Sequence, residues 1–176
     1  MLQEIEIVDT PGLNDPIVSR GEATKKFLGE CDVVFLLSYT GQFLTQEDIS
    51  FMRYTLPNEG IRNVIIVGSK FDSGILDNNR VKNLRTACNE SKRVYDGQAR
   101  ENIQKCLNVD ASNEVLKRIK ESLPPSYISA LLFSCAKKKE QEIPYSKQEA
   151  NIIEQLKRHF SDFTDDKDTL LSLSGI

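Results

Sequence analysis

Short apolar runs separated by polar stretches with helical spacing constrain the fold of this chain more than any other feature. The four runs are Ile5–Val8, Val33–Leu37, Val64–Val67 and Ile128–Phe133. Each has the length and branched composition of a buried strand. Between the runs, apolar residues recur at helical spacing after a predicted N-cap at Thr45, and Ser146 with Glu149 forms a capping box ahead of another such stretch. This alternation predicts an α/β fold in three layers, with a parallel sheet covered by helices on both faces.

The long polar stretch between the third and fourth runs predicts a helical insertion before the last strand. It covers about residues 73–126, has helical periodicity, and ends at Pro124-Pro125, which stops a helix. We expect two or three helices there, partly outside the core. Residues 1–162 then form one domain, and the acidic segment 163–176 is expected to be a linker or the start of a stalk.

Composition excludes several classes of function. The formal net charge of −3 supplies no basic field for nucleic acid or for an anionic lipid surface. One histidine and four widely spaced cysteines make a zinc site unfavourable. No apolar run approaches the roughly 18 residues of a membrane span. These features favour a cytoplasmic protein with reduced thiols.

Polar residues with the chemistry of a phosphate site follow the first run. Asp9-Thr10-Pro11-Gly12 comes directly after Ile5–Val8. A carboxylate at a strand end can hold the water shell of Mg²⁺, and a glycine lets a backbone N–H approach a phosphate oxygen. The alternative is a simple turn, because Pro-Gly is a common turn pair.

Two further polar segments follow the third and fourth runs. Ser69-Lys70-Phe71-Asp72 places a carboxylate where it can accept two hydrogen bonds from guanine, with a lysine stem along the base. In the other segment, Cys135-Ala136-Lys137, small residues would let a backbone N–H reach the base oxygen. Each segment alone is also consistent with an ordinary polar loop. Because all of them follow predicted parallel strands, they share the edge where open α/β sheets bind ligands.

Taken in order, these segments resemble the GTPase-superfamily motifs Asp-x-x-Gly, Asn/Thr-Lys-x-Asp and Ser-Ala-Lys. The phrases Asp9–Pro16 and Cys31–Leu37 are similar to those of the bacterial dynamin-like GTPases, and the superfamily resemblance covers roughly residues 4 to 160. Ser69 and Cys135 depart from the motifs, which have Asn or Thr and Ser at these positions.

The resemblance implies a role for each matching residue. Asp9, which is followed by Thr10, would contact Mg²⁺ through water, and Gly12 would donate its N–H to the γ-phosphate. Leu13–Glu30 would be the second switch. Lys70 and Asp72, next to Ser69, would hold the guanine, and Ala136 and Lys137, next to Cys135, would close the base pocket. No catalytic residue is assigned by the resemblance.

The phosphate-binding pattern Gly-x-x-x-x-Gly-Lys-Ser/Thr does not occur in these 176 residues. In the superfamily the sheet order is 2-3-1-4-5-6, and the four runs correspond to strands 3 to 6. We therefore expect a P-loop GTPase-like sheet that lacks its first strands and P-loop and has open apolar edges. Such a chain would be the C-terminal portion of a GTPase domain and inactive alone. For the whole protein, the resemblance implies GTP hydrolysis with Mg²⁺, self-association through the GTPase face, and peripheral membrane association, without nucleic acid.

Two other interpretations stay open at this stage. The chain could be a non-catalytic interaction module, or half of a split GTPase that another chain completes. It could also be an unrelated α/β domain whose three loops match the motifs by chance.

Overall fold

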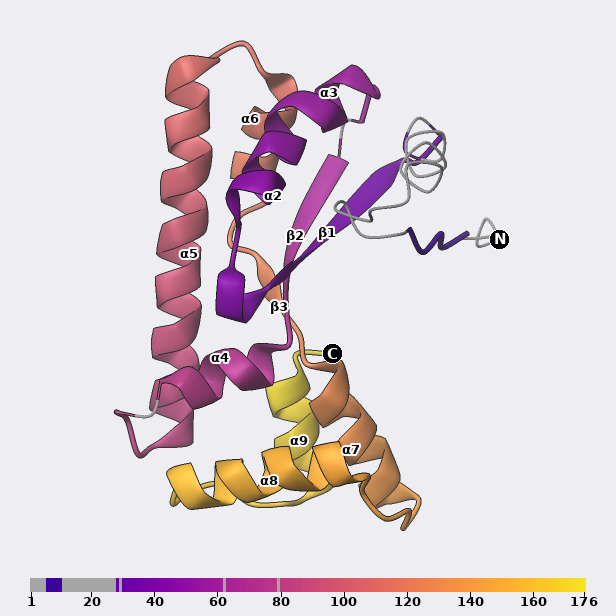
Figure 1. Ribbon diagram of the computed structural model, residues 1–176, viewed down its shortest axis with the longest axis vertical. Helices are drawn as coiled ribbons and strands as arrows, with labels where there is room; N and C mark the ends of the chain where they lie inside the picture. The colour runs from indigo at the N-terminus through magenta and orange to yellow at the C-terminus, as the bar shows by residue number, and fades with distance from the viewer. Residues whose placement is uncertain (1–5, 11–27, 29, 62, 79) are drawn as a thin grey trace.

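A computed structural model describes residues 6–10, 28, 30–61, 63–78 and 80–176 (Figure 1). The strands are β1 (Val33–Tyr39), β2 (Asn63–Ser69) and β3 (Ser126–Tyr127). The helices before β3 are η1 (Thr40–Gln42), α2 (Gln46–Ser50), η2 (Phe51–Thr55), α3 (Leu56–Asn58), α4 (Phe71–Asp77), α5 (Leu84–Val109) and α6 (Glu114–Glu121). The helices after β3 are α7 (Ala130–Glu140), α8 (Lys147–His159) and α9 (Lys167–Ser174).

The sheet is parallel and runs in the order β1-β2-β3. β1 pairs with β2 along its whole length, from Val33 opposite Asn63 to Tyr39 opposite Ser69. The strands predicted over 33–37 and 64–67 are therefore confirmed, as is the α/β class. Three neighbouring parallel strands in chain order are compatible with a P-loop GTPase-like sheet.

The prediction of a strand over Ile128–Phe133 is wrong. Only Ser126 and Tyr127 pair with β2, and α7 begins at Ala130. Ser129 is the N-cap of this helix, because its hydroxyl accepts a hydrogen bond of 3.2 Å from the backbone N–H of Leu132. An N-cap serine followed by good helix formers outweighs the strand preference of a short apolar run.

The first apolar run also departs from expectation in its described part. Residues 6–10 form no strand, and the side chains of Ile7 and Val8 are 89% and 37% exposed. A strand needs a hydrogen-bonded neighbour, and none of the described strands pairs with this segment.

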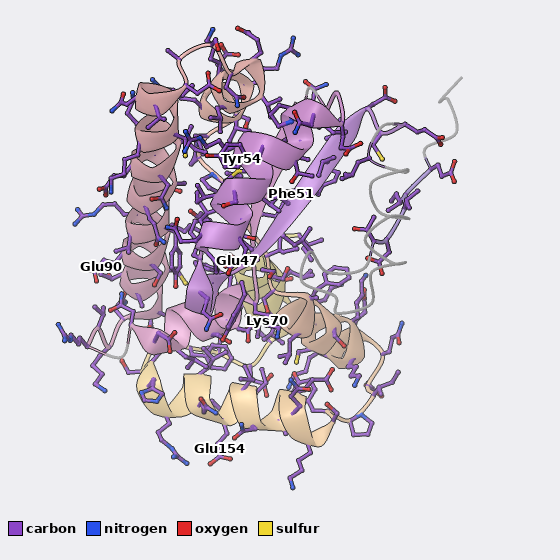
Figure 2. The ribbon with its side chains drawn as sticks, turned by 45° about the horizontal axis from the view of Figure 1, so that its top comes forward. Glu47, Phe51, Tyr54, Lys70, Glu90 and Glu154 are labelled. Carbon is purple, nitrogen blue, oxygen red and sulfur yellow. The ribbon has the colours of Figure 1, made fainter. Side chains whose placement is uncertain are left out.

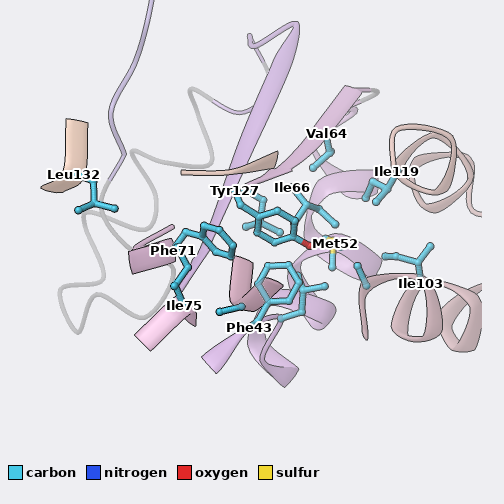
Figure 3. Packing of buried hydrophobic residues seen from close by; sticks show 14 of the residues in the cluster. Phe43, Met52, Val64, Ile66, Phe71, Ile75, Ile103, Ile119, Tyr127 and Leu132 are labelled. Carbon is cyan, nitrogen blue, oxygen red and sulfur yellow. The ribbon is translucent and has the colours of Figure 1, made fainter. Parts of the chain in front are cut away.

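The stretch predicted as a helical insertion contains α5 and α6, and one side of each helix packs in the core. Ile103 of α5 and Ile119 of α6 are fully buried, in one cluster with Met52 of η2 and Ile66 of β2 (Figure 3). The two helices cover one face of the sheet together with α2 and α3 (Figure 1). No helix among the described residues is long and apolar enough to cross a membrane.

Within the described residues, helices do not cover both faces of β1. The side chains of Leu36 and Ser38 are buried on the helix-covered face. The alternate residues Val33, Phe35, Leu37 and Tyr39 point the other way, because successive strand residues face opposite sides. We call these four residues the outer face of β1; all are exposed.

The segment 163–176, expected to be a linker or the start of a stalk, contains α9. This helix packs against α7, and its Leu170 is fully buried. Gly175 ends the helix at φ +71°, a left-handed conformation that glycine adopts without strain. α7, α8 and α9 form a group of helices beyond the carboxyl ends of the strands (Figure 1).

Candidate functional site

The carboxyl ends of β1 and β2 lie side by side and fix the loop that carries Lys70. Because the two strands are parallel and in register, Tyr39 ends opposite Ser69. The hydroxyl of Thr40 donates a 2.9 Å hydrogen bond to the carbonyl of Lys70, and the hydroxyl of Ser69 donates one of 3.3 Å to the carbonyl of Ser38. The loop between β2 and α4 is therefore held by the neighbouring strand end.

Lys70 adopts an unusual backbone conformation at this turn. Its φ of +52° and ψ of +45° are left-handed, which for a residue with a side chain costs on the order of 1 kcal/mol or more. The hydrogen bond from Thr40 helps to maintain this turn. The ammonium group lies 5.1 Å from the centre of the Tyr39 ring, so the side chain contacts the last residue of β1.

Asp72 lies in the first turn of α4 and is buried, with 4% exposure. Its Oδ1 accepts a hydrogen bond from the hydroxyl of Ser129, the N-cap of α7. The backbone N–H of Phe71 donates a 3.0 Å hydrogen bond to the carbonyl of Ile128, which brings the two loops together. Each carboxylate oxygen can accept two hydrogen bonds, so the bond from Ser129 leaves acceptor sites on both oxygens of Asp72.

Cys135, Ala136 and Lys137 do not form the loop that the sequence predicted. They lie within α7, and the side chains of Cys135 and Ala136 are buried. Burial raises the pKa of the Cys135 thiol to about 11. Lys137 instead pairs with Glu140 at 3.4 Å and lies over the ring of Phe133 at 5.7 Å. The expectation of a loop failed here because the fourth apolar run became a helix.

Asp9 and Thr10 lie in an exposed segment without regular structure, and Gly12 and most of Leu13–Glu30 lie outside the described residues. No hydrogen bond between described residues joins Asp9 to the Ser69–Asp72 loop. The described part of the chain gathers no three His, Cys, Asp or Glu side chains that could hold a metal. Asp9 alone therefore fits a water-mediated contact with Mg²⁺ but cannot form a protein cage for it.

Two residues that matter to this arrangement were missed by the motif search. Ser129 ties Asp72 to α7, and Thr40 ties Lys70 to β1. A serine three residues before Leu132 in an apolar stretch is a recognisable N-cap signal, so Ser129 could have been found. Thr40 gives no comparable signal, because its partner is a backbone carbonyl thirty positions along the chain.

Comparison with known proteins finds a similarity over the first part of the chain. The sequence profile of the dynamin family matches residues 1–71. These residues are related to a dynamin-family GTPase domain. The match includes the Asp9–Gly12 segment and Lys70 and ends directly before Asp72.

A curated relative is similar over the same part of the chain. Dynamin-like protein 1 of Campylobacter jejuni subsp. jejuni serotype O:23/36 (strain 81-176) is 41% identical over 68 residues. The similarity covers 39% of this chain and 9% of the relative, so the chain corresponds to about a tenth of that protein. No solved structure matches the chain.

Proposed function

We propose that this chain carries the second-switch and guanine-recognition part of a dynamin-like GTPase domain. The main support is the Lys70-Phe71-Asp72 segment, which follows β2 directly at the carboxyl edge of a parallel sheet. The dynamin-family match over residues 1–71 supports the same assignment independently of the sheet geometry.

In this proposal Asp72 accepts hydrogen bonds from the N1–H and the exocyclic amine of guanine at the acceptor sites that the Ser129 hydroxyl leaves free. The Lys70 stem, next to Ser69, packs along the base. Residues 135–137 reach the base only after the first turns of α7 open, since they now lie inside that helix.

Near the phosphates of GTP, Asp9 contacts the nucleotide-bound Mg²⁺ through a water molecule. Thr10 and Gly12 line the γ-phosphate, and Leu13–Glu30 responds to it as the second switch. We propose that the 176-residue chain binds GTP weakly and does not hydrolyse it. For the whole protein we propose cytoplasmic GTP hydrolysis, self-association through the GTPase face, and peripheral membrane association.

The test compares nucleotides by titrating the labelled chain and following its backbone amide resonances by NMR. Millimolar Mg²⁺–GTP is expected to shift the amides of Ser69–Asp72, whereas Mg²⁺–ATP is not, because adenine lacks the donor pair. Asp72→Asn should weaken GTP binding by about tenfold or more and improve binding of the xanthine nucleotide. Xanthine has a carbonyl where guanine has its amine, and the Asn amide can donate to it.

Asp77→Asn is the matched control, because Asp77 is the exposed last residue of the same helix α4. This variant should leave the GTP shifts unchanged. Equal shifts with GTP and ATP, or no shift of the Ser69–Asp72 amides at saturating GTP, would contradict the proposal.

A further inference from the structure

The end of α9 packs on the segment that joins β3 to α7. The carbonyl of Ser174, the last residue of α9, accepts a 2.8 Å hydrogen bond from the backbone N–H of Ser129. Both residues are fully buried, and Gly175 lies so close to the carbonyl oxygen of Tyr127 that a Cβ there would collide with it. Because Ser129 is buried from water, moving the end of α9 would leave its N–H without this acceptor.

The same segment is also bonded to the β2 side of the sheet. The backbone N–H of Ile128 donates a 2.9 Å hydrogen bond to the carbonyl of Gly68, and the N–H of Phe71 donates one of 3.0 Å to the carbonyl of Ile128. Residues 127–129 therefore lie between the end of α9 and the loop that follows β2. These contacts are backbone hydrogen bonds, so a displacement of α9 can reach that loop through the main chain.

The hydroxyl of Ser129 extends this connection to Asp72. Its oxygen accepts a 3.2 Å hydrogen bond from the N–H of Leu132, and it donates its hydrogen to Oδ1 of Asp72. Ser129 is thus held at its backbone N–H by Ser174 and at its hydroxyl by two further partners. A contact to two donors of guanine needs both carboxylate oxygens in the plane of the base, so it depends on the orientation that Ser129 gives to Asp72.

We propose that Ser174 is a positioning residue for Asp72, acting through Ser129, and that the position of α9 is thereby coupled to guanine binding. The inference rests on the proposed guanine site. When α9 is docked, Ser129 holds the Asp72 carboxylate in the orientation that the base needs, and when α9 is displaced the carboxylate can turn. Coupling between two sites is reciprocal, so guanine bound at Asp72 also holds the end of α9 in place.

α9 has a second contact, whose effect on guanine binding would have the opposite sign. It packs against α7, which contains residues 135–137, and so stabilises the helix that must open before those residues reach the base. Asp72 accepts the two hydrogen bonds that distinguish guanine from adenine. We therefore expect the docked α9 to favour guanine binding, and the sign of the measured effect separates the two contacts.

The first experiment uses Gly175→Ala, which displaces the end of α9, and needs no nucleotide. In NMR spectra of the variant, the Ser129 amide and the side-chain carboxyl ¹³C of Asp72 should both shift. Gly60→Ala is the matched control, because Gly60 also has a left-handed φ of +76° but a Cβ there meets no atom within 4 Å. This control should leave both resonances unchanged.

The second experiment measures nucleotide binding by the same variants. Gly175→Ala should weaken binding of Mg²⁺–GTP by about fivefold or more, and Gly60→Ala should not. Ser129→Ala removes the connecting hydroxyl, so adding Gly175→Ala to it should cause no further loss. In the original chain, Mg²⁺–GTP should slow hydrogen exchange of the Ser129 amide more than that of the buried Leu116 amide in α6, and Mg²⁺–ATP should not.

Each result has a definite meaning. An unchanged Asp72 resonance in Gly175→Ala would overturn the proposal even if the chain binds GTP. Tighter GTP binding by this variant would also overturn it, because α9 would then act mainly by holding α7 closed. Additive losses from Gly175→Ala and Ser129→Ala would exclude Ser129 as the connection. A chain that binds no GTP would contradict the proposed guanine site, whereas the Asp72 resonance would still decide whether α9 positions the carboxylate.

Discussion

Glu149 is a buried carboxylate whose removal should make the stability of this protein much less sensitive to acid. It is 7% exposed and lies in the first turn of α8. It accepts hydrogen bonds from the Lys138 ammonium at 2.6 Å, the Ser146 backbone N–H at 2.7 Å and the Ser134 hydroxyl at 2.8 Å. Burial alone would raise the pKa of this carboxyl, but the hydrogen bonds from Lys138, Ser146 and Ser134 lower it from 4.5 to about 2.

The size of the effect follows from linkage between protonation and folding. The carboxyl of Glu149 has a lower pKa in the folded chain than in the unfolded chain, so its charged form stabilises the fold. This stabilisation is complete above the unfolded pKa of 4.5 and is lost as the pH falls toward the folded pKa of about 2. At about 1.4 kcal/mol per pKa unit, the charged form of Glu149 contributes about 3 kcal/mol at neutral pH. About 2 kcal/mol of that contribution is lost by pH 3.

The perturbation is Glu149→Gln, measured by urea unfolding followed by circular dichroism at pH 7 and pH 3. The variant should be about 2–3 kcal/mol less stable at pH 7, while at pH 3 the two proteins should differ by only about 1 kcal/mol. Glu154→Gln is the control on the same helix (Figure 2), because its ion pair with Arg158 is exposed and such pairs contribute little. The same loss of stability at both pH values would refute the linkage argument.

Three further predictions test the core, the end of α9 and a buried thiol. Leu116→Ala removes a side chain with 0% exposure and should lower the free energy of unfolding by about 2–5 kcal/mol in urea titrations. Gly175→Ala should lower the melting temperature and speed amide exchange in α9, because a Cβ there would collide with the Tyr127 carbonyl oxygen at a left-handed φ. Burial raises the pKa of the Cys135 thiol to about 11, so Cys135 should react with a disulfide reagent at pH 8 only when the chain unfolds. Rapid labelling of the folded chain would contradict this prediction.

The parts of the fold that the sequence predicted correctly are those specified locally. Val33–Leu37 and Val64–Val67 are rich in branched apolar residues and became strands β1 and β2. Thr45 was predicted as an N-cap and Ser146 with Glu149 as a capping box, and both residues form capping boxes in the structure.

The prediction failed where the outcome depends on a partner or on competing propensities. A short apolar run does not distinguish a buried strand from a buried helix, so Ile128–Phe133 was assigned to the wrong element. Ile7 and Val8 have strand-forming side chains, but pairing needs a neighbour that local sequence does not specify.

At the candidate site, the sequence placed Lys70 and Asp72 correctly at the end of β2. It could not reveal that Asp72 is buried under Ser129, because these residues are 57 positions apart. A contact at that separation depends on tertiary packing and cannot be predicted from the motif residues alone.

The junction between α7 and α9 affects the order in which this protein can mature on the ribosome. The backbone N–H of Ser129, the N-cap of α7, donates a 2.8 Å hydrogen bond to the carbonyl of Ser174, so this residue gains that partner only after α9 has been synthesised. β1 and β2 can pair before then, and translation of the intervening chain takes on the order of seconds. During the part of that interval before Ser129 is made, Asp72 lacks the partner that its carboxylate has in the folded protein.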